Sequence, residues 1–284
     1  GIEGAKQSVE LACKSEIPTI EQFFGTGTSG DIRKRLPNRK NIRLILAMNV
    51  LAHTDNIGEV LDEIKMLMDD NTVLISSNHW LIELIRKCEF DTIYHEHLRY
   101  YTLGSLEKLF ERHGLHIYDG LVTDFYGGSI LTYATIEPHP KTSQLNKILS
   151  EESQVDVVSS LKHMKIDLIQ NKSKLLDLLV NLKLDGKRVV GIGAPMKAST
   201  LLNFYGITPD LMDSIAEVNE LKIGTMVPGV RIPVVDEVAL LNQEPDYSVL
   251  LSWNMAQPII RNYRAMGYKG RFIMPVPRPE VIDE

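Results

Sequence analysis

Apolar runs and amphipathic segments alternate along the first 140 residues of the chain. The mostly apolar run from Ile42 to Ala47 has the character of a buried strand, and apolar residues three and four apart from Ile57 to Met68 predict a helix. Thr72 to Ser76 is the next strand candidate. Because strands and helices alternate, this region predicts a parallel sheet with crossover helices.

Further elements flank this pattern. Gly1-Ile2-Glu3 has the pattern of a strand end, and Gly25 to Gly30 is a polar, glycine-rich break. Helical spacing is seen from Ala5 to Lys14 and from Leu103 to His113, and Ile17 to Ile20 is a short apolar extended segment. The β-rich stretches His116 to Val122 and Ile130 to Ile136 predict an antiparallel pair that closes one edge of the sheet.

The composition changes from Lys141 to Leu184, where leucines three or four apart predict one or two long helices. A second α/β unit follows, with a strand at Val189 to Ile192, a helix through Phe204, and strand candidates at Asp213 to Val218, Ile232 to Val235, Tyr247 to Leu251 and Arg271 to Met274. We therefore expect an α/β protein with a domain at residues 1–140, a helical connector at 141–184 and a second, Rossmann-like domain at 185–284.

Charge and cysteine content exclude several classes of protein. The chain has 31 basic and 37 acidic side chains, a formal charge of -6, and no concentrated Lys/Arg stripe, so nucleic acid is a poor candidate partner. Cys13 and Cys88 lie too far apart for a CxxC pair, which is typical of buried thiols in a reducing compartment. No apolar run approaches the roughly 20 residues that span a bilayer. We expect a soluble, cytoplasmic protein without a membrane partner.

The densest group of reactive side chains is Asp91-Thr92-Ile93-Tyr94-His95-Glu96-His97. An imidazole is a proton acceptor near neutrality, a carboxylate can orient it, and a phenol can donate to a developing oxyanion. This set of groups favours removal of a proton beside a carbonyl. Two alternatives remain open: a metal site with two His and one Glu ligand, or a polar loop whose histidines cap the helix at Leu103. The spacing offers no further His/Cys cluster, so we expect no metal.

A second motif, Gly191-Ile192-Gly193-Ala194-Pro195-Met196, is a partial dinucleotide fingerprint because Met196 stands at the third glycine position. A strand precedes it and a helix follows it, and Lys197 lies in the first turn of that helix, which suits a pyrophosphate. Glu217 follows at a spacing typical of a ribose-binding acid. The other interpretation treats Lys197 and Lys222 as solvated surface charges.

These motifs resemble those of the sugar-nucleotide C-methyltransferases, which methylate deoxysugars such as those of antibiotic glycosides. The resemblance is carried by these segments in the same order along nearly the whole chain: Glu89 to Leu98, Ser105-Leu106-Glu107, His113-Gly114-Leu115, Gly127-Gly128-Ser129, Gly191 to Lys197, Thr200 to Asn203, Pro228-Gly229 and Ser252-Trp253-Asn254. One departure is Tyr126, where members of the family often have His.

The resemblance implies an S-adenosylmethionine-dependent C-methyltransferase that acts on a nucleotide-linked keto-deoxysugar. It assigns proton abstraction to His97 and Glu96, with Glu96 holding His97, and places Tyr94 at the substrate. Glu3 matches the acid that binds the ribose of the methyl donor, and Asn49 and His53 match residues at the end of the fourth strand of that domain. It also implies that Gly191, Gly193, Lys197, Glu217 and Lys222 bind the nucleoside diphosphate sugar.

Members of that family carry a cysteine-rich zinc module and a first Gly-rich strand-turn-helix before the segment that matches Gly1-Ile2-Glu3. We therefore expect a truncated class I methyltransferase sheet, an incomplete S-adenosylmethionine site and an inactive chain as it stands. The missing central strand would require rearrangement around Ile2, Ile17 to Ile20 and Ile42 to Ala47, or self-association through the sheet.

Two other functions stay open at this point: a nicotinamide oxidoreductase built on the Gly191 turn, or a non-catalytic nucleotide-binding fragment. For the methyltransferase, we expect a cleft between the two domains lined by Tyr94, Glu96 and His97.

Overall fold

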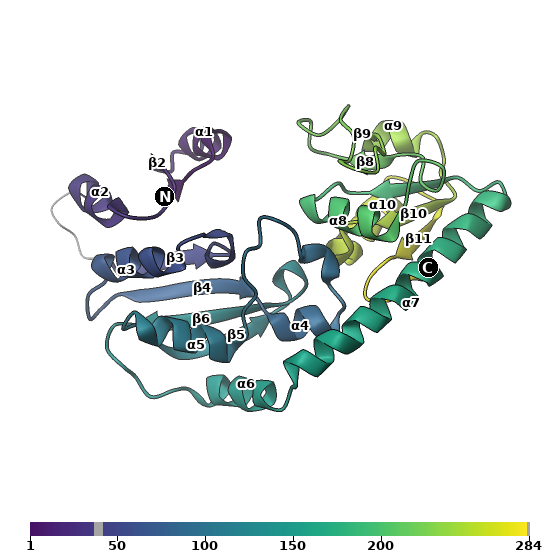
Figure 1. Cartoon of the computed structure of the whole chain (residues 1–284). Coiled ribbons are helices and arrows are strands. Elements are labelled where there is room, and N and C mark those ends of the chain that lie inside the picture. Colours follow the sequence, from purple (N-terminus) through teal and green to yellow (C-terminus); the bar gives the residue numbers. More distant parts are fainter. Residues whose placement is uncertain (37–41, 283–284) are drawn as a thin grey trace. The chain divides into compact units, whose positions relative to one another are not determined.

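The computed structural model describes residues 1–36 and 42–282. Contacts divide these residues into two compact units, and Figure 1 labels most of their helices and strands. The first unit consists of residues 1–80, 98–124 and 128–154, and the second consists of residues 81–97, 125–127 and 155–284. Residues 81–97 lie in chain order between the second and third strands of the first unit's sheet, but they belong to the C-terminal unit.

The first unit contains a four-stranded mixed sheet in the order β3-β4-β6-β5. β3 (Leu44–Met48) is parallel to β4 (Val73–His79), β4 is antiparallel to β6 (Ser129–Thr135), and β6 is antiparallel to β5 (His116–Thr123). The closing antiparallel pair predicted from the sequence is confirmed. Three helices belong to this sheet and its connections: α3 (Ile57–Leu67), α5 (Leu103–Arg112) and α6 (Ser143–Ser153).

Local signals explain the positions of these helices. α3 buries Val60, Leu61, Ile64 and Leu67, which recur at helical spacing on one face. α5 begins at a reciprocal capping box, in which Thr102 Oγ1 accepts from the Ser105 N–H and Ser105 Oγ accepts from the Thr102 N–H.

The N-terminal residues form a separate two-stranded parallel ladder. β1 (Ile2–Glu3) pairs with β2 (Ile20–Glu21), and α1 (Lys6–Lys14) makes the crossover between them. α2 (Thr28–Arg35) follows, and it is tied to α3 because the Glu63 carboxylate accepts the N–H groups of Gly27 and Ser29 at 2.7 Å each.

No strand of the described residues pairs with the outer edge of β3, so the rearrangement expected from the sequence is not seen among them. Leu44, Leu46 and Met48 on this strand are about half exposed. Beside β3 lies a hollow of about 280 Å³ with an apolar lining that includes Ile2, Leu46 and Leu67. Completion of the sheet by a second chain stays a prediction.

The second unit contains a six-stranded sheet in the order β12-β11-β10-β7-β8-β9. β7 (Val189–Ile192), β8 (Ile215–Glu217), β9 (Val234–Asp236), β10 (Tyr247–Leu250) and β11 (Arg271–Met274) are parallel, and β12 (Glu280–Ile282) is an antiparallel edge. The strand order reverses at β7 because β8 and β10 lie on opposite sides of it. In such sheets, ligands bind where the order reverses, beyond the carboxyl ends of the strands.

Five α-helices of the described residues belong to this unit. They are α4 (Leu81–Arg86), α7 (Val157–Leu184), α8 (Met196–Tyr205), α9 (Glu237–Leu241) and α10 (Ala256–Ala265). Val190, Ile192, Leu250, Ile260 and Phe272 form the centre of one buried cluster between the strands and α10. The chain therefore has the α/β fold class that its sequence predicts. Among the described residues, no helix is both long and apolar enough to span a membrane.

Candidate active site

The segment that carries the reactive side chains is anchored by a short 3-10 helix, Phe90–Thr92, all of whose residues are buried. Phe90 packs on two rings of α8, with centroid distances of 4.9 Å to Phe204 and 5.1 Å to Tyr205. The main-chain N–H groups of Thr92 and Ile93 donate to the carbonyls of Glu89 and Phe90, which closes the turn. The chain that follows, Tyr94 to His97, therefore starts from a fixed base.

His97 is oriented by the main chain of this 3-10 helix. Its Nδ1 lies 2.7 Å from the carbonyl oxygen of Thr92. Because a carbonyl can only accept, the neutral ring carries its proton on Nδ1, and Nε2 is then the basic nitrogen. The sequence assigned this orienting role to Glu96, but the partner of Nδ1 is the carbonyl of Thr92.

Tyr94 lies beside this basic nitrogen. Its hydroxyl is 3.5 Å from Nε2 of His97, and the two rings are 4.5 Å apart at a tilted angle. Burial, with a smaller contribution from the charge of Glu96, raises the pKa of Tyr94 above its ordinary value of 10.0. The phenol therefore stays protonated over the physiological range and remains a hydrogen-bond donor.

Tyr94 and His95 line a hollow of about 480 Å³ in the second unit. The other residues that contribute to its wall come from the β7–α8 turn, from α8 and from the chain around Pro228: Ala194, Pro195, Met196, Ala198, Ser199, Thr200, Lys222, Thr225, Met226, Val227, Pro228 and Val234. α8 begins after Pro195 without a side-chain cap. The Ala198 N–H donates to the Pro195 carbonyl at 2.9 Å, and no side chain occupies this positive end of the helix, where an anion would be favoured.

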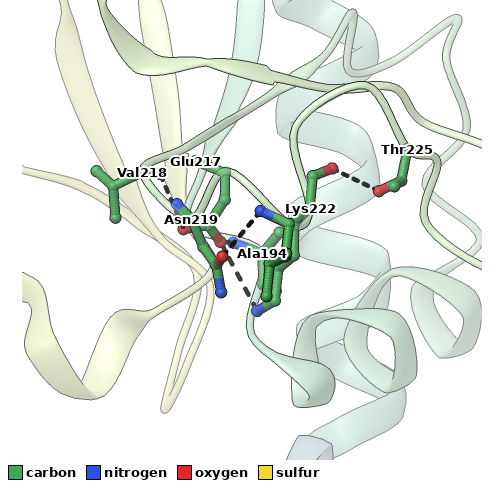
Figure 2. Close-up of polar contacts among 7 residues, drawn as sticks. Ala194, Glu217, Val218, Asn219, Lys222 and Thr225 are labelled. Atoms are coloured by element: carbon green, nitrogen blue, oxygen red, sulfur yellow. Dashed lines mark hydrogen bonds and ion pairs between the residues drawn. The ribbon is translucent and has the colours of Figure 1, made fainter. Parts of the chain in front are cut away.

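Glu217, at the end of β8, holds the turn after β7 in place. Its Oε2 accepts from the Ala194 N–H at 2.9 Å, and its Oε1 accepts from the N–H groups of Val218 and Asn219 at 2.9 and 3.1 Å. Figure 2 shows these contacts together with Lys222, whose Nζ donates to the Ala194 carbonyl at 2.8 Å and lies 3.9 Å from the carboxylate. Burial alone would raise the pKa of Glu217, but these N–H groups and Lys222 outweigh it and lower the pKa below 4.5.

This geometry differs from the ribose-binding role that spacing gave to Glu217. A carboxylate accepts about four hydrogen bonds, and three positions are occupied by main-chain N–H groups. Glu217 does line a second hollow of about 700 Å³, together with Gly193, Lys222 and Ser252, at the point where the strand order reverses. Its principal structural effect is to fix the wall of that hollow.

Gly191 and Gly193 are required by different features of the structure. A Cβ on Gly191 would lie 2.9 Å from side-chain atoms of Ile215 and of Leu251, so this residue serves close packing inside the sheet. Gly193 has φ +81°, and a Cβ there would collide with Oγ of Ser252. Only Gly193 lines the 700 Å³ hollow.

Lys197 does not point to either hollow. Its Nζ lies 3.7 Å from the centroid of the Trp253 ring and 3.7 Å from Oδ2 of Asp91, and 12% of its side chain is exposed. The pyrophosphate role predicted for Lys197 is therefore not supported, because its ammonium faces into the protein. Sequence reasoning named Asp91 and Trp253 within motifs but gave neither a role.

The residues predicted to bind the methyl donor lie in the first unit. Oε1 of Glu3, at the carboxyl end of β1, accepts from the Ala5 N–H at 2.8 Å. Asn49 follows β3 with φ +54°, and its N–H donates to the Ser77 carbonyl at 2.8 Å. His53 ends a 3-10 helix, Leu51–His53, just beyond. Asn49 and His53 thus share one end of β3, whereas Glu3 belongs to the other ladder.

Within the described residues, no group of three or more His, Cys, Asp or Glu side chains is arranged to hold a metal ion.

Comparisons with known proteins agree with the class that the fold and the site indicate. Residues 13–119 match the family model described as a methyltransferase domain, and residues 124–277 match the one described as the C-methyltransferase C-terminal domain. The chain is 32% identical over 288 residues to the C-methyltransferase NovU of Streptomyces niveus, an alignment that covers 99% of this chain and 68% of that protein. The chain belongs to the C-methyltransferase family, whose enzymes depend on S-adenosylmethionine.

Matches to solved structures are weak. A putative methyltransferase in complex with the Trm112 activator of Haloferax volcanii is 13% identical, with a TM-score of 0.37 over 50% of this chain and 72% of that one. An S-adenosylmethionine-dependent methyltransferase of Thermotoga maritima is 15% identical, with a TM-score of 0.35 over 48% and 72%. The chain spans 35% of the length of another match, LepI in complex with S-adenosylmethionine, with a TM-score of 0.35 and 12% identity over 48% of this chain.

Proposed function

We propose that this C-methyltransferase acts on a nucleotide-linked keto-deoxysugar and that His97 removes the proton beside the sugar ketone. One observation carries the proposal. The Thr92 carbonyl occupies Nδ1 of His97, so Nε2 is the basic nitrogen, and it lies beside the Tyr94 hydroxyl. Tyr94 in turn lines a hollow large enough for a sugar.

The proposed chemistry requires a base that acts at the carbon beside the ketone and a hydrogen-bond donor that acts on the ketone oxygen. Nε2 of His97 takes the proton as the C–H bond breaks, and the electron pair of that C–H bond forms the enolate. The Tyr94 hydroxyl donates to the oxygen on which negative charge develops. The imidazolium then keeps its Nδ1–H bond to Thr92, so the ring stays in place while it holds the proton.

Two features support a nucleoside diphosphate as the part of the acceptor substrate that the second unit binds. Lys222 lines both the 480 Å³ and the 700 Å³ hollow, and the uncapped N-terminus of α8 opens on the same turn. Gly193 lets the chain pass close to a ligand at this point. We assign the diphosphate to Lys222 and the start of α8, with Glu217 as the residue that holds the turn.

For the donor, Glu3 has the chemistry that the ribose of S-adenosylmethionine requires. Its carboxylate is fixed through Oε1 at the carboxyl end of a parallel strand, which is the edge where such sheets bind ligands. Asn49 and His53 would complete this side of the site from the end of β3. When bound, S-adenosylmethionine supplies an electrophilic methyl group to the enolate carbon.

Exchange of the acidic proton with deuterium oxide tests the base directly, because it needs no methyl donor. The chain is incubated with uridine and thymidine diphosphate-linked 4-keto-6-deoxyhexoses, and deuterium uptake at the carbons beside the ketone is followed by NMR. We expect catalysed uptake at one such carbon and a loss of about 10²- to 10⁴-fold in His97→Gln.

A matched control is His163→Gln. His163 also presents Nδ1 to a main-chain carbonyl, that of Ser159 at 2.8 Å, but on the exposed surface of α7. It should leave exchange unchanged. Absence of uptake with the wild-type chain, or full uptake in His97→Gln, would refute the proposed role of His97.

Titration calorimetry with uridine diphosphate and thymidine diphosphate tests whether the chain binds a nucleoside diphosphate. Lys222→Met should weaken binding by about tenfold or more, since charge-assisted hydrogen bonds to phosphate are strong. Lys187→Met is the control, because Lys187 pairs with Asp246 near the amino ends of the strands. Equal affinities of the two variants would contradict the assignment of Lys222.

A further inference from the structure

A buried group of three side chains in the second unit, Lys197, Asp91 and Trp253, is called the Asp91 cluster below. The indole N–H of Trp253 donates to Oδ2 of Asp91 at 2.6 Å, and Nζ of Lys197 lies 3.7 Å from the same oxygen. The ammonium also lies over the indole ring at 3.7 Å. The cluster joins three elements: the 3-10 helix Phe90–Thr92, the first turn of α8 and the chain just after β10.

The cluster is costly as a purely structural contact. The Asp91 side chain has no exposed surface, and neither Oδ1 of Asp91 nor Nζ of Lys197 has a hydrogen-bond partner in the described residues. Burial raises the pKa of Asp91 and lowers that of Lys197, and in each case the partner's charge opposes that shift. Apolar residues of similar volume would often stabilise a fold as well or better. A functional reason for these charges is therefore the stronger explanation.

That reason lies one peptide bond away. Asp91 is followed by Thr92, whose carbonyl oxygen holds Nδ1 of His97. The side chain of Thr92 is itself fixed, because its Oγ1 donates to the Glu89 carbonyl at 2.7 Å. The Thr92 carbonyl belongs to the next peptide group along the chain, so we expect a displacement of Asp91 to shift the carbonyl that selects the tautomer of His97.

We propose that Lys197 and Trp253 are positioning residues for the base: they hold Asp91 and thereby keep the Thr92 carbonyl on Nδ1 of His97. This inference rests on the proposed role of His97 as the base. It gives Lys197 a function that differs from phosphate binding, and it gives a function to the Trp of the Ser252-Trp253-Asn254 segment. Neither residue touches the substrate in this account.

The test observes the imidazole itself in the whole chain labelled with nitrogen-15 histidine. NMR of the ring nitrogens distinguishes the two tautomers, and His97→Gln identifies the His97 signals by their loss. We expect wild-type His97 to carry its proton on Nδ1 and to show mixed tautomers in Lys197→Met and Trp253→Phe. Deuterium exchange should fall about tenfold to a hundredfold in both, as expected for a misplaced catalytic group, with an acceptor KM within about twofold.

A second variant distinguishes positioning from general damage. Lys197→Met leaves the Asp91 carboxylate without its cation, whereas Asp91→Asn combined with Lys197→Met removes both charges and keeps an acceptor for the Trp253 N–H. The double variant should recover the Nδ1–H signal and most of the exchange rate. Lys183→Met is the control, since it breaks a partly buried Lys–Asp pair with Asp213 at 2.6 Å elsewhere in the same unit.

The outcomes separate this inference from the proposed function. Unchanged tautomer and exchange in folded Lys197→Met and Trp253→Phe would overturn the inference and leave the base intact. If the tautomer changes in these variants but the wild-type chain catalyses no proton exchange, the proposed function is overturned and the positioning of His97 is retained. Failure of the double variant to recover the Nδ1–H signal would show that Lys197 does not act on His97 through Asp91.

Discussion

The indole N–H of Trp253 and the carboxylate of Asp91 form a 2.6 Å hydrogen bond between residues that are 162 positions apart in the chain. The bond joins the carboxyl end of the Rossmann-like sheet to the segment that carries Tyr94 and His97. Both partners are buried, so water cannot replace either one without a rearrangement. The segment that carries the proposed base is thus held by the domain that we propose binds the nucleotide.

Loss of this bond should be measurable as a loss of stability. We expect Trp253→Phe to lower the free energy of unfolding by about 1.5–3 kcal/mol, the usual range for a hydrogen bond to a charged group. Urea unfolding followed by circular dichroism measures the change. In an Asp91→Val background the same substitution should have a smaller effect, because no carboxylate remains. Equal effects in the two backgrounds would contradict a specific bond.

Two glycines of the second unit offer a matched comparison of backbone and contact effects. Gly193 and Gly206 have φ +81° and +74°, but a Cβ on Gly206 would meet nothing within 4 Å, whereas one on Gly193 would lie 3.1 Å from the Ser252 Cβ. Gly206→Ala should destabilise by about 1 kcal/mol through its backbone conformation alone. Gly193→Ala should cost about 1–3 kcal/mol more through overpacking. Equal unfolding free energies of the two variants would disprove the close approach of Ser252.

The contacts of Glu217 predict how stability depends on pH. Its pKa is lower in the folded chain than the ordinary 4.5, so its contribution is fully present above about that pH and is lost as the pH falls through the lower, folded value. The difference in unfolding free energy between the wild type and Glu217→Gln should therefore shrink from pH 6 to pH 3. Glu220→Gln, at an exposed neighbouring position, is the control for loss of a carboxylate in this loop. A difference that grows on acidification would contradict the contacts to Ala194 and Asn219.

Much of this fold follows from local pattern alone. The strands β3 and β4 and the helix α3 between them were predictable because their apolar residues repeat with the period of the element. α2 was not, since Gly25 to Gly30 is polar and glycine-rich in sequence. Its N-terminus is satisfied by Glu63, 34 residues from Ser29, and no local signal shows that contact.

The candidate site also has features that its sequence predicts and features that its sequence does not. Tyr94 and His97 were proposed from their residue types and their nearness in sequence. The partner of the His97 ring was not, because a main-chain carbonyl has no signature in the sequence. The position of Lys197 at the start of α8 suggested a phosphate ligand, but the direction of its side chain depends on Trp253 and Asp91, which lie far away in the chain.

Tyr94 provides the last prediction, because its phenol is proposed to donate to the enolate oxygen. Tyr94→Phe keeps the ring beside His97 and removes the donor, so proton exchange should fall by about 10²- to 10³-fold, the usual effect of losing one oxyanion donor. The affinity for a nucleoside diphosphate should not change, since that contact is assigned to Lys222 and α8. Burial raises the pKa of Tyr94 above 10.0, so any decline of the wild-type exchange rate through loss of the phenol proton should begin at a higher pH than for an ordinary tyrosine. Tyr118→Phe, in the first unit, serves as the control for loss of a phenol elsewhere. Exchange in Tyr94→Phe at the wild-type rate would show that the enolate oxygen takes its hydrogen bond from another group.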